Sequence, residues 1–242
     1  MIDMPATDAL RRIRRVALGD FIHRSALKFG ERTAVVDGDT RLNYRELDAR
    51  SSRFAHHLIG TIGGGRQVGM LCANSADMVV AYNGIHKSGN VWVPVNIRLD
   101  VAGIDYILRH AEVAAVVVDE AFHAAPGVAD MLTRLGVPLI VTLAAQAGTA
   151  IAGAVTLAQA EAGQSAELPA IDIDSNAPAL IMYTSGTNVV PLSYKKNGGL
   201  CRDRAGRVLG CAAAVSLRPA RPGGHGASGR RLHRAAARLR AR

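Results

Sequence analysis

The chain has 242 residues, 49% of them apolar, and a formal net charge of +9. The charge is uneven, because residues 1–187 carry 16 basic and 19 acidic side chains, whereas residues 188–242 carry 13 basic side chains and the single acid Asp203. No uncharged apolar stretch reaches about 18 residues, which excludes a membrane-spanning helix. Residues 1–187 have the composition of a globular domain large enough to bury a core, so the overall charge is a poor guide to partners.

The cysteines and the N-terminus indicate the compartment. Cys72, Cys201 and Cys211 form an odd set without CxxC spacing, so neither a disulfide framework nor a zinc site is supported. The arginines at the N-terminus precede an apolar run, Val16–Gly19, that is too short for a signal peptide. We therefore expect a cytoplasmic protein in which residues 1–19 form a separate N-terminal segment.

Short β-branched runs alternate with longer helical patterns, which is typical of βαβ units and a largely parallel sheet. The turn at residues 37–39 predicts a hairpin between the strands Thr33–Val36 and Thr40–Leu42. A helix follows from Asn43, and its end is marked by Gly60 and by the glycines at 63–65. This helix has two groups of side chains, an apolar side of Leu47, Phe54 and Leu58 and arginines away from it, Arg45, Arg50 and Arg53.

The Gly63–Gly65 cluster could be mistaken for a phosphate cradle. A cradle follows a strand and opens a helix, whereas these glycines end a helix and precede a strand, so we predict a plain loop. After the next strand, Asn74 or Ser75 is expected to cap a helix with Asp77 in its first turn. Further along the chain we expect strands at 67–72, 91–95, 113–118, 137–142 and 177–183 and helices at 105–110 and 128–135.

The sequence allows two structural interpretations for each of two segments. Pro94 inside the strand at 91–95 indicates either an edge position or an early end of the strand. Residues 144–164, rich in Ala, Gly and Thr, form either a weak helix near Leu157 or a connecting loop. Of the eight histidines none is spaced as a metal pair, and His56 and His57 point to different faces of one helix, so we expect solvated or packed histidines.

The strand at 177–183 runs directly into Thr184, Ser185, Gly186 and Thr187. A turn of hydroxyl residues and glycine at the end of a strand lies where open α/β sheets usually bind their ligands. Hydroxyls and exposed amides suit phosphate oxygens and can support a magnesium ion. Taken alone, such a tetrapeptide is most often only a turn.

The surrounding residues resemble the adenylate-forming superfamily, the acyl-CoA synthetases and their relatives. Ile181–Thr187 resembles the start of its phosphate-binding signature, Leu42–Leu47 its "LTYxEL" segment, and Lys87–Leu99 its "KxGAvxVPINxRL" segment. Asn96 and Arg98 are typical of the fatty-acid CoA ligase branch. The resemblance covers residues 20–187 and implies an α/β fold: the N-terminal αβ subdomain of an adenylate-forming enzyme, a mostly parallel sheet flanked by helices. We expect the first two segments to be scaffold.

The resemblance implies that ATP binds at Thr184, Ser185, Gly186 and Thr187, with Thr184 also as a Mg²⁺ ligand. It also implies a fatty acid or other carboxylate as substrate, coenzyme A as co-substrate, and a reaction through an acyl-adenylate. The family signature continues Thr-Gly-x-Pro-Lys-Gly. Aligned without gaps, only Pro191 matches this continuation; in a second alignment, residues 189–197 resemble the stretch that follows it, as though the glycine-rich loop had been removed. Since the family's catalytic residues lie further downstream, we assign no catalytic residue and expect this truncated chain to be inactive alone.

Beyond Gly198 the family features end. Arg, Ala and Gly account for 29 of the last 55 residues, and Tyr194 is the only aromatic there. This composition favours an out-of-frame reading of GC-rich coding sequence, and it predicts a disordered basic tail at 188–242. One alternative is a non-catalytic protein with an arginine-rich arm that binds nucleic acid, although such arms usually interleave aromatic residues for stacking. Another is an interaction module, residues 1–187, that complements a separately encoded C-terminal half.

Overall fold

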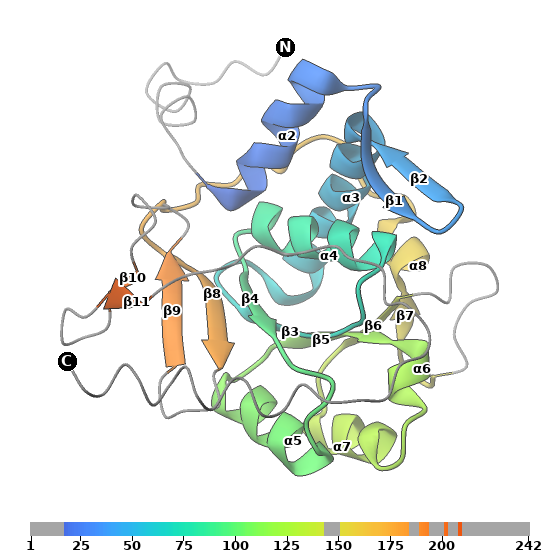
Figure 1. Cartoon of the computed structure of the whole chain (residues 1–242), viewed down its shortest axis with the longest axis vertical. Helices are drawn as coiled ribbons and strands as arrows, with labels where there is room; N and C mark the ends of the chain where they lie inside the picture. The colour runs from blue at the N-terminus through green and yellow to red at the C-terminus, as the bar shows by residue number, and fades with distance from the viewer. Residues whose placement is uncertain (1–16, 143–150, 184–188, 194–200, 203–207, 210–242) are drawn as a thin grey trace, which may run out of the picture. The chain divides into compact units, whose positions relative to one another are not determined.

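The computed structural model describes residues 17–142, 151–183, 189–193, 201–202 and 208–209. Its main element is a sheet in the order β7-β6-β5-β3-β4-β8-β9, parallel throughout except that β9 runs antiparallel to β8. This arrangement confirms the predicted, mostly parallel α/β fold (Figure 1). The strands are β3 (Gln67–Leu71), β4 (Val91–Pro94), β5 (Ala115–Asp119), β6 (Leu139–Thr142), β7 (Val155–Thr156), β8 (Pro178–Tyr183) and β9 (Val189–Ser193).

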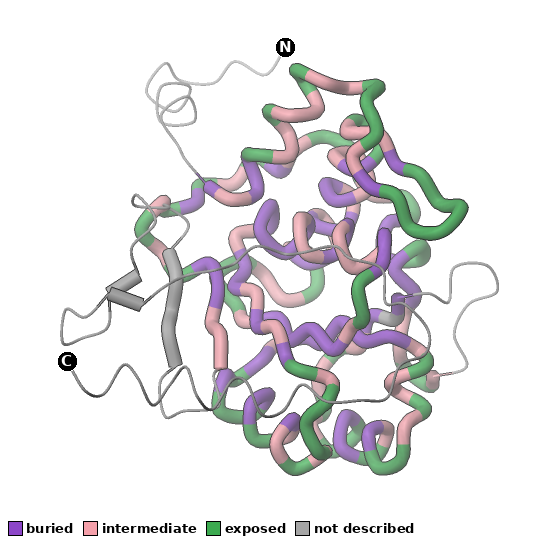
Figure 2. Tube along the Cα trace, in the orientation of Figure 1, coloured by how far each residue is buried: buried purple, intermediate pink, exposed green. Residues whose placement is uncertain are grey.

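Helices cover both faces of this sheet. The strand β5 is buried along its whole length, and its side chains alternate between the two cores: Ala115 and Val117 face one, Val116 and Val118 the other. Figure 2 shows the buried residues concentrated along the central strands and the inner sides of the helices. The first core is covered by α3 (Tyr44–Ile62), α4 (Ala76–Lys87) and α8 (Leu157–Glu161), the second by α5 (Val101–His110), α6 (Glu120–His123) and α7 (Val128–Leu135).

A hairpin and a further helix lie beside the first core. The strands β1 (Thr33–Asp37) and β2 (Thr40–Asn43) pair antiparallel, as predicted. Helix α2 (Leu18–Phe29) packs on α3 and α4 and approaches α4 so closely that a Cβ at Gly19 would lie 2.7 Å from the Lys87 backbone. Only glycine fits at this crossing without a shift of the helices.

Side-chain caps start two of the helices. Asn43 caps α3: its side chain accepts the Glu46 N–H at 2.8 Å while the Glu46 carboxylate accepts the Asn43 N–H at 2.8 Å. Ser75, rather than Asn74, caps α4 by accepting the Met78 N–H at 3.1 Å. The predicted plain loop after α3 is confirmed, since Gly63 has a φ of 78° and the chain leads from it into β3.

Some predictions were wrong in detail. The edge position offered for Pro94 is incorrect, because β4 lies between β3 and β8; the alternative, an early strand end at Pro94, is correct. Helix α5 is longer than predicted because Asp100 accepts the Gly103 N–H at 2.9 Å and starts it at Val101. In the segment after β6, the short strand β7 was missed, whereas the weak helix near Leu157 is α8.

The C-terminal segment is described only in part. Residues 189–193 belong to the main sheet as β9, although we had assigned them to the tail, and β10 (Cys201–Arg202) pairs antiparallel with β11 (Val208–Leu209). The other residues of 188–242 lie outside the described part, so their predicted disorder stays a prediction. Among the described helices, none is both long and apolar enough to cross a membrane.

Candidate functional site

The predicted nucleotide segment begins where β8 ends. Thr184, Ser185, Gly186 and Thr187 all lie outside the described residues, so their predicted contacts with ATP and Mg²⁺ stay predictions. The residues that flank the segment are described: Tyr183 and Val189 are register partners in β8 and β9. The residues on either side of the segment are therefore paired with each other at the carboxyl end of β8.

Because β8 runs parallel to β4, its carboxyl end lies at the same edge of the sheet as the carboxyl ends of β3 and β5. Buried Asp119 at the end of β5 accepts the Ala73 N–H at 2.6 Å and the hydroxyl hydrogen of Thr142. Burial and the Asp119 charge raise the pKa of the neighbouring Cys72 thiol well above its usual range, so this cysteine is not a reactive thiolate. Asp119 and Thr142 are thus hydrogen-bonded within the protein at the sheet edge where open α/β sheets bind their ligands.

One side-chain contact ties the end of β8 to the neighbouring helix. The Tyr183 hydroxyl lies 2.6 Å from His110 Nδ1, at the last residue of α5. The His110 ring also stacks on Tyr106, with ring centroids 5.4 Å apart. Partial burial and the nearby Tyr106 raise the pKa of Tyr183, so its phenol keeps its proton and can donate to His110.

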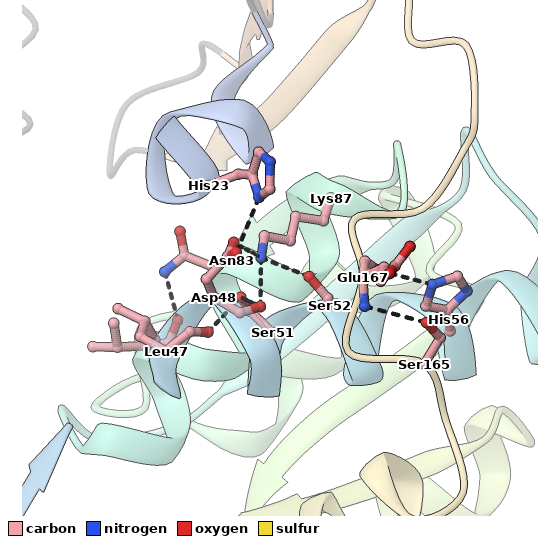
Figure 3. Close-up of polar contacts among 11 residues, drawn as sticks. His23, Leu47, Asp48, Ser51, Ser52, His56, Asn83, Lys87, Ser165 and Glu167 are labelled. Atoms are coloured by element: carbon pink, nitrogen blue, oxygen red, sulfur yellow. Dashed lines mark hydrogen bonds and ion pairs between the residues drawn. The ribbon is translucent and has the colours of Figure 1, made fainter. Parts of the chain in front are cut away.

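A buried lysine cluster lies between α2, α3 and α4 (Figure 3). The Lys87 side chain is fully buried, and its ammonium donates to Asp48 Oδ1 at 2.5 Å, to the Asp48 carbonyl at 2.7 Å and to Ser52 Oγ at 2.9 Å. All three ammonium hydrogens thus have an acceptor. The other Asp48 oxygen, Oδ2, lies 3.0 Å from His23 Nδ1 on α2.

Sequence analysis missed this cluster, although Lys87 begins one of the family-like segments. Asp48 and Ser52 are four residues apart and therefore share a face of α3, on which buried Ala55 also lies. A carboxylate and a hydroxyl inside an apolar helix face are a signal that a buried cation is near. A cavity of about 550 Å³ adjoins the cluster and is lined by Asp20, His23, Arg24, Asp48 and residues 166–169.

Titration of Lys87 is expected to make stability depend on alkaline pH. Burial, opposed by attraction to Asp48, lowers the pKa of Lys87 from 10.5 to about 8. Between pH 8 and pH 10.5 the unfolded chain therefore binds more protons than the folded one, and the free energy of unfolding rises with pH. We expect the stability difference between wild type and Lys87→Met to grow across this window by up to about 3 kcal/mol, measured by urea unfolding. A difference that stays constant or shrinks would contradict this.

Among the described histidines, His86 is a packed side chain, as expected. Buried His86 lies edge-on to Tyr82, with ring centroids 4.7 Å apart, and burial lowers the pKa of His86 to about 3, so it is neutral. Within the described ranges, no three His, Cys, Asp or Glu side chains are grouped as a metal site would need.

Comparison with known proteins places the chain in a family. A family model described as "AMP-binding enzyme" matches residues 22–191. The human mitochondrial malonate–CoA ligase is 34% identical over 173 residues, 69% of this chain and 28% of that protein. The syringomycin synthase SyrB1 of Pseudomonas syringae pv. syringae is 31% identical over 186 residues, 75% of this chain and 27% of that protein.

Comparison of the fold with solved structures also finds acyl-CoA ligases. The crystal structure of a long-chain-fatty-acid–CoA ligase from Archaeoglobus fulgidus superimposes with a TM-score of 0.64 and 23% identity, covering 74% of this chain and 37% of that one. The chain thus spans between 27% and 37% of the length of these three proteins. Because the family model covers most of its residues, this chain belongs to the AMP-binding enzyme family, with acyl-CoA ligases among its relatives.

Proposed function

We propose that this chain supplies the nucleotide-binding part of a cytoplasmic, AMP-forming acyl-CoA ligase. The observation that carries the proposal is the Thr-Ser-Gly-Thr segment, which leaves β8 at the carboxyl edge of the parallel sheet in a member of the AMP-binding enzyme family. Backbone amides and hydroxyls at such an edge are suited to phosphate oxygens. The relatives named above act on different carboxylates, so the fatty-acid class rests on the resemblance of Asn96 and Arg98 alone.

The residues fit a Mg²⁺-bound triphosphate. The hydroxyls of Thr184, Ser185 and Thr187 would donate hydrogen bonds to phosphate oxygens, and Gly186 would let the backbone approach those oxygens. The hydroxyl oxygen of Thr184 would also coordinate Mg²⁺. In the proposed ligase, the substrate carboxylate would attack the α-phosphorus of ATP with release of pyrophosphate, and the thiol of coenzyme A would then displace AMP from the acyl-adenylate. Mg²⁺ offsets the negative charge on the phosphates. In this proposal, the role of this chain is to bind and orient the triphosphate.

We infer that the chain alone forms no appreciable acyl-CoA. Where the family signature continues as a glycine-rich loop, residues 189–193 here form the strand β9, paired with β8. A β-strand cannot wrap phosphates as a glycine-rich loop does, because its amides point alternately to neighbouring strands. A separately encoded C-terminal half would therefore have to supply a phosphate-wrapping loop as well as catalytic residues, and co-expression with such a half tests whether acyl-CoA formation is restored.

Binding of ATP by the 242-residue chain tests the proposal directly. We expect calorimetry with ATP and Mg²⁺ to show binding, and we expect Thr184→Val to weaken it about 10- to 100-fold, since a hydrogen bond to a charged group contributes about 1.5–3 kcal/mol. The matched control is Thr33→Val, on the exposed end of the hairpin, which should leave affinity unchanged.

The same purified chain is used to test whether it is catalytically inactive on its own. Pyrophosphate release is measured with ATP, Mg²⁺, coenzyme A and a panel of carboxylates from malonate to long-chain fatty acids. Release at an enzyme-like rate would show that the chain is active alone, whereas failure of wild type to bind ATP would refute the nucleotide-binding role itself.

A further inference from the structure

The end of β8 is held unevenly in the sheet. Its register with β4 consists of Trp92 opposite Leu180, whereas its register with β9 extends to Tyr183. The strand β4 ends at Pro94, which has no amide hydrogen to offer a neighbouring strand. The last residues of β8 therefore take their register partners from β9 alone.

The side chain of Tyr183 connects the end of β8 to a second element, helix α5. Its ring packs against the second core, and its hydroxyl lies 2.6 Å from His110 Nδ1 with the two rings perpendicular at 86°. Helix α5, which carries His110, is fixed to the sheet by fully buried Ile104 and Leu108. The hydrogen bond thus joins a strand end that has one-sided pairing to a firmly packed helix.

We propose that His110 is a positioning residue for the segment that begins at Thr184, acting through the hydroxyl of Tyr183. Tyr183 is the residue immediately before Thr184, so fixing its side chain restricts where the following hydroxyl and amide groups start. The ligand class is the triphosphate of a nucleoside triphosphate, and this part of the inference rests on the proposed function. Neither residue touches the nucleotide in this scheme, and their effect is on affinity rather than on chemistry.

Five variants of the full chain, among them the double variant Tyr183→Phe/His110→Leu, separate this role from general stability. Tyr183→Phe and His110→Leu remove the bond but keep ring or bulk, and Tyr44→Phe at the start of α3 is the matched control. His110→Asn is the conservative variant, because an Asn side-chain oxygen can take the place of Nδ1 as acceptor. Two readouts are used: hydrogen–deuterium exchange of residues 184–188 without nucleotide, and the Kd for ATP with Mg²⁺.

We expect Tyr183→Phe and His110→Leu each to speed hydrogen–deuterium exchange of residues 184–188. Each should also raise the Kd for ATP by about 2- to 10-fold, the effect of losing one exposed hydrogen bond. The double variant should be no worse than either single one, and His110→Asn and Tyr44→Phe should match wild type, with thermal midpoints unchanged in all. Equal exchange in all variants would overturn the positioning role, whether or not ATP binds. Changed exchange in a chain that binds no ATP would support the positioning role and refute the proposed function.

Discussion

Replacement of Asp48 by alanine is expected to lower the free energy of unfolding by about 3–5 kcal/mol. The variant leaves the Lys87 ammonium buried without its carboxylate, which had been 2.5 Å away. Lys87 cannot turn to solvent, because α2 covers it where Gly19 meets the α4 backbone. Urea unfolding at pH 7 measures the loss.

The control variant removes the other member of the ion pair, Lys87. Lys87→Met removes the buried cation, while Asp48, 14% exposed, keeps His23 as a partner, so we expect a smaller loss than for Asp48→Ala. The double variant Asp48→Ala/Lys87→Met should be more stable than Asp48→Ala alone, because it contains no buried unpaired charge. A double variant less stable than Asp48→Ala would show that the lysine stem, rather than its charge, determines the cost.

Replacement of Arg50 by alanine is the second large expected effect, a loss of about 3 kcal/mol in the free energy of unfolding. The Arg50 guanidinium lies 2.8 Å from Glu161 on α8 and 3.0 Å from Asp77 in the first turn of α4. Removing it deprives the largely buried carboxylates of Glu161 and Asp77 of the Arg50 cation, and α8 then contacts α3 through apolar packing without this ion pair. Thermal or urea unfolding of the variant checks the magnitude.

The geometry of this ion pair provides a graded test. Arg50 donates to Glu161 from both Nε and Nη2, which a lysine cannot reproduce, so Arg50→Lys should fall between wild type and Arg50→Ala. The exposed pair of Arg45 and Glu31 is the matched control, and Arg45→Ala should change stability by about 0.5 kcal/mol or less. Equal losses for Arg50→Ala and Arg45→Ala would contradict the importance of burial.

Local sequence signals predicted most of the fold. The hairpin, the helix that follows Asn43, the cap at Asn74 or Ser75, and the buried strand β5 each depend on a few neighbouring residues, and the structure confirms them, with Ser75 as the cap. The family-like segments likewise predicted the AMP-binding enzyme family, which the comparisons confirm. The nucleotide segment, Thr184–Thr187, could be located by sequence at a strand end, but its contacts lie outside the described residues and stay predictions.

The sequence by itself determined the family and most of the strands and helices, because periodicity, capping and motif spacing are properties of neighbouring residues. Only the tertiary structure decided the central position of β4, the burial of Lys87 beneath α2, the pairing of Arg50 with Glu161, and the bond between His110 and Tyr183. Arg50 and Glu161 are 111 residues apart, and His110 and Tyr183 are 73 apart. Partners at such separations are brought together by strand order and helix packing, which the local pattern around either residue does not contain.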